Sequence, residues 1–75
     1  MARARRQLFI CVDNAGFEVS LERRKIYECL SDPAAARRGL LRIIDEFGED
    51  YLYPEAMFVA ASLPTSVRRA VLQAA

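Results

Sequence analysis

Six residues, DEFGED, bring four carboxylates around one glycine. Asp45 and Glu46 precede Gly48, and Glu49 and Asp50 follow it. Carboxylates at a turn can bind Ca²⁺ or Mg²⁺, and a carboxylate pair in which one pKa is raised can act as general acid and base. The spacing fits no calcium loop, and strand alternation sends Glu49 and Asp50 to opposite faces. The segment is therefore interpreted as a solvated turn, with no metal, catalytic residue or cofactor expected.

Two tyrosines follow this turn at alternate positions. Side chains alternate along a strand, so Tyr51 and Tyr53 are expected on one face. With Phe58 and Phe17 they form a candidate partner-binding set, an aromatic platform for a peptide or a base. The same rings could instead be core, because a small barrel needs large side chains inside. If Leu52 points inward, the tyrosines lie on the surface, and the pattern alone leaves both arrangements open.

Basic residues form the third group. The candidate nucleic-acid-binding residues are Arg23, Arg24, Lys25, Arg37 and Arg38. If such clusters converge, they can neutralise phosphates and drive nucleic-acid binding. However, eleven basic and ten acidic residues are interleaved and give a formal charge of +1, which favours scattered, solvated charge. The net charge creates no field for nucleic acid or a membrane.

The absence of histidine removes several chemistries. A Cys/His zinc site and a Ser/His or Cys/His nucleophile pair are excluded. Cys11 and Cys29 lie in apolar segments, so reduced thiols packed as small hydrophobes are expected. The apolar run from Leu8 to Val12 is shorter than the roughly 7–15 residues of a signal peptide core, and no stretch approaches the roughly 20 residues of a membrane helix. A cytoplasmic protein that does not enter the membrane is therefore expected.

The remaining pattern predicts the elements that hold these residues. A chain of 75 residues, 53% hydrophobic and 28% charged, is typical of one globular domain. A flexible basic arm is predicted over 1–7 and a single domain over 8–75. Runs rich in β-forming residues, separated by turn residues, predict five strands: Leu8–Val12, Lys25–Leu30, Leu40–Ile44, Glu49–Tyr53 and Phe58–Leu63. At most one helical turn is expected after Pro33, and a 3₁₀-like turn is expected from Pro54 to Met57.

The last segment predicts a helix over 65–74, with Thr65 as its N-cap. Its apolar stripe contains Leu63, Val67, Val71 and Leu72. We expect the stripe to cover the open end of its own barrel, although a twofold partner or another protein would also bury it. The fold class predicted is mainly β: a small five-stranded antiparallel barrel with a short C-terminal helix, because closing the sheet removes exposed edges.

The order of these parts resembles a Src-homology-3-like (SH3-like) barrel. A long irregular loop spans Asp13–Arg24, a second loop spans Ser31–Gly39, a tight turn follows at 45–48, and a Pro-led turn lies in YLYPEAMFV. The resemblance implies that architecture. The proline-peptide groove of the eukaryotic signalling domains depends on a tryptophan, and this chain has none, so that activity is not implied.

The stretch DEFGEDYLYP with a following phenylalanine is also similar to a group of small, uncharacterised bacterial proteins, and this likeness implies no chemistry. By elimination, the sequence predicts a non-catalytic interaction module rather than an enzyme, since so short a chain leaves little room for a substrate pocket beside its core. A protein partner is the leading expectation, and nucleic acid bound by the arginine clusters is the alternative. A monomer and a homodimer are both compatible with the sequence.

Overall fold

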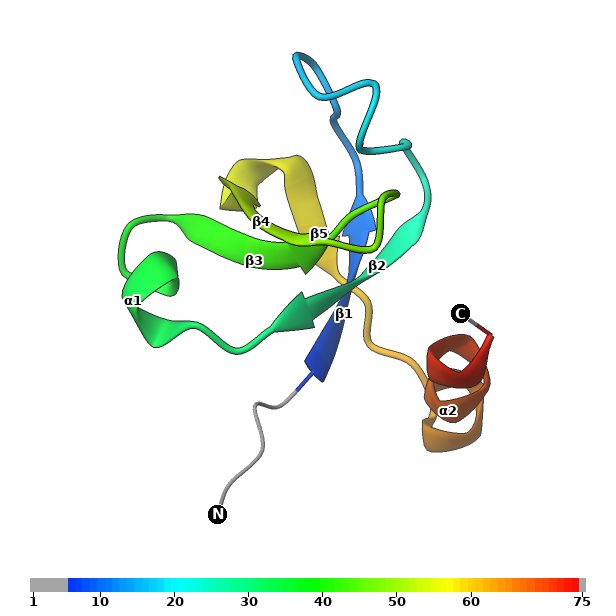
Figure 1. The fold of residues 1–75 in the computed structure, drawn as a ribbon. Coiled ribbons are helices and arrows are strands. Elements are labelled where there is room, and N and C mark those ends of the chain that lie inside the picture. Colours follow the sequence, from blue (N-terminus) through cyan, green and yellow to red (C-terminus); the bar gives the residue numbers. More distant parts are fainter. Residues whose placement is uncertain (1–5, 75) are drawn as a thin grey trace.

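The computed structural model describes residues 6–74, and its strands form one antiparallel sheet (Figure 1). The elements are β1 (Arg6–Cys11), β2 (Ile26–Leu30), α1 (Pro33–Ala36), β3 (Leu40–Ile44), β4 (Asp50–Pro54), η1 (Glu55–Met57), β5 (Phe58–Ala60) and α2 (Thr65–Gln73). The five strands lie in the order β4-β3-β2-β1-β5, which confirms the mainly β prediction. Within 6–74 no pairing joins β4 to β5, so hydrogen bonds do not close the sheet into the predicted barrel.

The strand boundaries differ from the predicted ones mainly at the two ends of the sheet. Arg6 and Gln7, predicted in the flexible arm, are part of β1 and pair with Leu30 and Cys29 of β2. The rest of the predicted arm, 1–5, lies outside the described residues. β5 ends at Ala60 rather than Leu63, because its pairing with β1 stops there and the chain leaves the sheet toward α2.

Side chains in the two loops bind backbone groups and shape the connections. In the long loop between β1 and β2, the Asn14 side chain donates to the Leu21 carbonyl over 2.9 Å, and Leu21 is buried in the core. Asp32 caps α1 by accepting a hydrogen bond from the backbone N–H of Ala35 at 3.0 Å. The long loop is therefore anchored to the sheet rather than free in solvent.

One face of the sheet carries the core. The buried cluster consists of Cys11, Leu21, Tyr27, Cys29, Ile43, Tyr53 and Phe58. Phe58 packs edge-on against two tyrosine rings, with centroids 6.5 Å from Tyr27 and 6.4 Å from Tyr53. Both cysteines are free and buried, as predicted, and burial is the largest cause that raises each thiol's pKa.

The helix α2 lies beside the other face of the sheet rather than over the open end of the core (Figure 1). Leu8 is buried there, outside the core cluster, and a hollow of about 590 Å³ separates Val71 and Ala74 from Ile26 and Ile44. None of the helix residues is buried. The expectation that the apolar stripe covers the barrel end is therefore wrong. Pro64, in an extended conformation, precedes the helix and no side chain caps it, so Thr65 is the first helical residue and not the N-cap.

Candidate functional site: an aromatic groove

Exposed apolar side chains gather where the β3–β4 turn approaches the long loop. Phe47, Tyr51 and Leu52 are 64%, 54% and 39% exposed. All three line a groove of about 400 Å³, together with Phe17, Tyr53, Ser20, Asp45 and Glu49. We refer to these eight residues as the aromatic groove. Phe47 and Tyr51 present exposed rings to this concave surface, whereas Leu52 stands opposite Arg42 on the other face of β4 and contributes only to the groove edge.

The turn between β3 and β4 positions Phe47. The Asp45 side chain accepts a hydrogen bond from the Phe47 N–H at 2.9 Å, and the Gly48 N–H donates to the Asp45 carbonyl at 3.0 Å. Gly48 has a φ of +75°, a left-handed conformation that glycine adopts at low steric cost. This short, closed turn places Phe47 outside the core, where its exposed side chain lines the groove.

The floor of the groove is polar and buried. The Tyr53 hydroxyl lies 2.8 Å from Asp45 Oδ2 and 3.0 Å from Ser20 Oγ, and Asp45 is only 7% exposed. The Phe17 ring packs edge-on against Tyr53, with centroids 5.1 Å apart and an angle of 85°. Burial raises the pKa of Tyr53, and the neighbouring Asp45 carboxylate adds to this effect.

The rim is formed by the edge strand β4. Tyr51 stands opposite the fully buried Ile43 in the β3–β4 register, so both side chains belong to the same face. Tyr51 is nevertheless exposed, whereas Tyr53, two residues further along the same face of β4, is buried, so the core ends between these two positions. The Tyr51 hydroxyl donates to Glu49 Oε2 at 3.1 Å, and this hydrogen bond raises the Tyr51 pKa.

The predicted aromatic set is divided by the fold. Tyr53 and Phe58 are core residues, so neither forms an exposed platform, although the Tyr53 hydroxyl reaches the groove floor. Phe17 is half-buried in the groove wall and Tyr51 is exposed at its rim. Phe47 was missed from the sequence because it lies inside a segment that indicates a turn. The available signal was a large aromatic residue among turn residues.

The four carboxylates of the opening segment point to different partners. Asp45 faces the groove floor, and Asp50 accepts from Arg42 at 3.1 Å. Glu46 accepts from the Tyr27 hydroxyl at 2.5 Å and pairs with Lys25 at 2.6 Å. Lys25 is the main cause of the lowered pKa of Glu46, and Tyr27 is the second. Over residues 6–74 the structure has no cluster of three potential metal ligands.

The arginine clusters lie at different ends of the sheet. Arg23, Arg24 and Lys25 precede β2, whereas Arg37 and Arg38 follow α1, beyond the other end of that strand (Figure 1). A strand rises about 3.3 Å per residue, so the five-residue β2 separates the clusters by roughly 15 Å or more. Lys25 is also paired with Glu46. The fold therefore does not merge these residues into one basic face.

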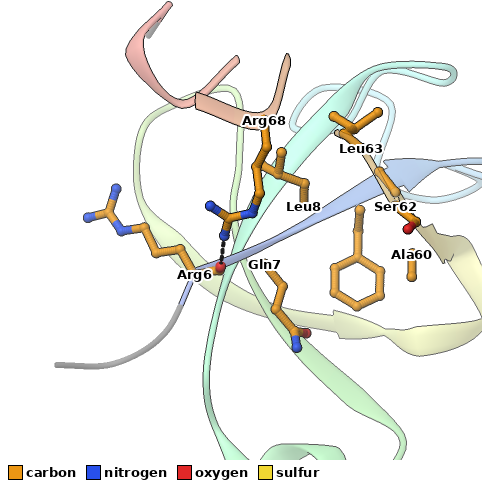
Figure 2. Close-up of a pocket in the computed structure, with 9 residues that line it drawn as sticks. Arg6, Gln7, Leu8, Ala60, Ser62, Leu63 and Arg68 are labelled. Carbon is orange, nitrogen blue, oxygen red and sulfur yellow. Dashed lines mark hydrogen bonds between the residues drawn. The ribbon is translucent and has the colours of Figure 1, made fainter. Parts of the chain in front are cut away.

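A second hollow, of about 370 Å³, lies between β1 and the start of α2. Figure 2 shows the Arg68 guanidinium reaching across it to donate a hydrogen bond to the backbone carbonyl of Arg6. The Arg6 side chain points away and pairs with Glu28 at 2.8 Å. Arg68 thus joins α2 to β1, and we interpret this hollow as the attachment point of the helix.

Comparison with known proteins identifies no relative: no family model, curated protein or solved structure matches the chain. The two resemblances therefore rest on the sequence pattern alone. Neither helix in the described part of the chain is long and apolar enough to cross a membrane.

Proposed function

We propose that this protein is a non-catalytic interaction module of the Src-homology-3-like kind, which binds a segment of a partner protein in the aromatic groove. The observation that carries the proposal is that the exposed rings of Phe47 and Tyr51 line one concave site. The strand order and the Pro-led turn before β5 are compatible with that architecture.

Aromatic side chains are the residues that most often dominate binding at protein interfaces. Here the backbone that carries them is held in place, because Phe47 lies in a hydrogen-bonded turn and Tyr51 in a paired strand. Little backbone freedom would be lost when a partner binds, which favours affinity. A small groove of this kind suits an extended segment better than a large flat interface.

Nucleic-acid binding ranks second, because the arginine clusters lie beyond opposite ends of β2. A pull-down from the host lysate, with and without nuclease, separates the two functions. A protein partner retained after nuclease treatment supports the groove proposal. Recovery of nucleic acid alone, with affinity that falls steeply as salt is raised, favours the arginine clusters.

The direct test is selection from a random-peptide display library on the wild-type protein, followed by affinity measurements on variants. The double variant Phe47→Ala/Tyr51→Ala should weaken binding of the selected peptides at least about tenfold, since interface aromatics often contribute 2 kcal/mol or more each. Val59→Ala is the matched control, because Val59 is 49% exposed on β5, at the opposite edge of the sheet.

The control variant should bind the selected peptides as the wild type does. All proteins are first compared by circular dichroism and thermal unfolding, so that lost binding is not lost folding. The proposal is wrong if the library yields no binder, or if the double variant binds as tightly as the wild type.

A further inference from the structure

We propose that the aromatic groove selects an arginine side chain in the partner segment. This selection presupposes the proposed function and adds the chemistry of the ligand. The first observation is charge: two carboxylates, Asp45 and Glu49, line the groove, and no basic residue within 6–74 does. A bound cation would therefore meet complementary charge on both the floor and the rim.

Two basic side chains close in sequence to the groove, those of Lys25 and Arg42, are engaged in ion pairs elsewhere. Arg23 and Arg24, which follow Ser20 in the long loop, do not line the groove. Lys25 pairs with Glu46 at 2.6 Å, and Arg42 pairs with Asp32 at 2.8 Å and with Asp50 at 3.1 Å. Among the side chains of residues 6–74, no ion pair involves Asp45 or Glu49. The groove therefore presents negative charge that the described part of the molecule does not neutralise.

The floor also argues against a purely apolar occupant. Asp45 is almost entirely buried, and its oxygens accept one hydrogen bond each, from the Phe47 N–H and the Tyr53 hydroxyl. A carboxylate oxygen can accept more than one hydrogen bond. An apolar side chain pressed into the groove would remove water from the exposed Glu49 carboxylate beside it without replacing that water, which is costly. A cation replaces that water with an attractive partner.

The rings decide between the two basic side chains. Phe47, Tyr51 and Phe17 offer aromatic surface around the carboxylates, and a cation over an aromatic ring is attracted by its quadrupole. The guanidinium group of arginine is planar and weakly hydrated, so it stacks on rings and still directs several N–H donors to carboxylates. The ammonium group of lysine is a compact, strongly hydrated charge. The mixture of rings and carboxylates therefore favours arginine.

The test compares two capped pentapeptides that differ only in the central residue. One has arginine flanked by glycines and serines, and the other has citrulline, the neutral isostere of arginine, at the same position. Binding is followed by the amide chemical shifts of the groove residues in the full-length protein. We expect the arginine peptide to bind at least about fivefold more tightly, from ion-pair and cation–π attraction at a partly exposed site. Added salt should weaken the arginine peptide more than the citrulline peptide.

Two variants test whether the Glu49 carboxylate attracts the arginine side chain. Glu49→Gln should reduce affinity for the arginine peptide about two- to fivefold. The control Glu55→Gln removes an exposed carboxylate from η1, at the other end of β4, and should leave affinity unchanged. Both substitutions are on the surface, so neither should unfold the protein.

One outcome would overturn the arginine inference and leave the proposed function standing. In that outcome the arginine and citrulline peptides bind the wild type with equal affinity, and the double variant Phe47→Ala/Tyr51→Ala binds neither. Library binders that share no arginine would do the same. If neither Glu49→Gln nor the double variant changes the affinity for the arginine peptide, the peptide binds outside the aromatic groove. That result also overturns the inference. A library without binders overturns the proposed function itself.

Discussion

Tyr53→Phe tests the hydrogen bond beneath the aromatic groove. The substitution keeps the ring in the core but removes the hydroxyl that lies 2.8 Å from Asp45 Oδ2. That oxygen belongs to a side chain only 7% exposed, so water replaces the lost donor poorly. A hydrogen bond to a charged group contributes about 1.5–3 kcal/mol. We expect the free energy of unfolding to fall by about 2 kcal/mol, which lowers Tm by about 8–16 °C in a domain of this size.

The assay is urea and thermal unfolding followed by far-ultraviolet circular dichroism. Tyr51→Phe is the matched control, because its hydroxyl bonds the exposed Glu49, and it should change stability by less than about 0.5 kcal/mol. In a double-mutant cycle with Asp45→Ala, the coupling to Tyr53→Phe should be about 1–2 kcal/mol. If Tyr53→Phe costs no more than Tyr51→Phe, or if the two effects are additive, the buried hydrogen bond is not what stabilises the groove floor.

Two further predictions concern the long loop and the tyrosines. Leu21→Ala should lower the free energy of unfolding by about 2–5 kcal/mol, because Leu21 is only 1% exposed. The control Val19→Ala, in the same loop but 82% exposed, should lower it by less than about 0.5 kcal/mol. Equal effects of the two substitutions would show that the loop is not anchored. All three tyrosines have raised pKa values, from burial at Tyr27 and Tyr53 and from Glu49 at Tyr51. Their contribution to stability is therefore present below the unfolded tyrosine pKa of about 10 and is lost as pH rises above it. In the folded protein, tyrosinate absorbance should appear only above that pH. Tyrosines that titrate with the ordinary pKa in the native state would contradict this prediction.

Local chemistry was enough to predict several elements. β3 has the predicted bounds Leu40–Ile44, since a continuous β-forming run is delimited by Gly39 and the acidic turn. The glycine of that turn has the expected positive φ, and the Pro-led segment forms the expected 3₁₀ turn. Such features depend on a few neighbouring residues, and those neighbours are visible in the sequence.

The candidate site was predicted only in part. The alternation of Tyr51 and Tyr53 correctly placed both on one face of a strand, but alternation does not say where the core ends along that face. Phe17 and Ser20 come from the long loop, far from Asp45 and Tyr51 in the chain, and only the folded loop brings them to the groove. Phe47 had no strand or helix pattern to identify it.

The sequence by itself determined that this chain has a mainly β fold, free cysteines, a tight acidic turn and a short C-terminal helix. These properties follow from residue type and short-range spacing, which act over one turn or one strand. Only the tertiary structure decided that Tyr53 is buried while Tyr51 is exposed, that α2 lies beside the outer face near Leu8, and that the arginine clusters stay apart. Each of these depends on which distant segments share the limited core of a small domain, and burial is a property of that shared packing.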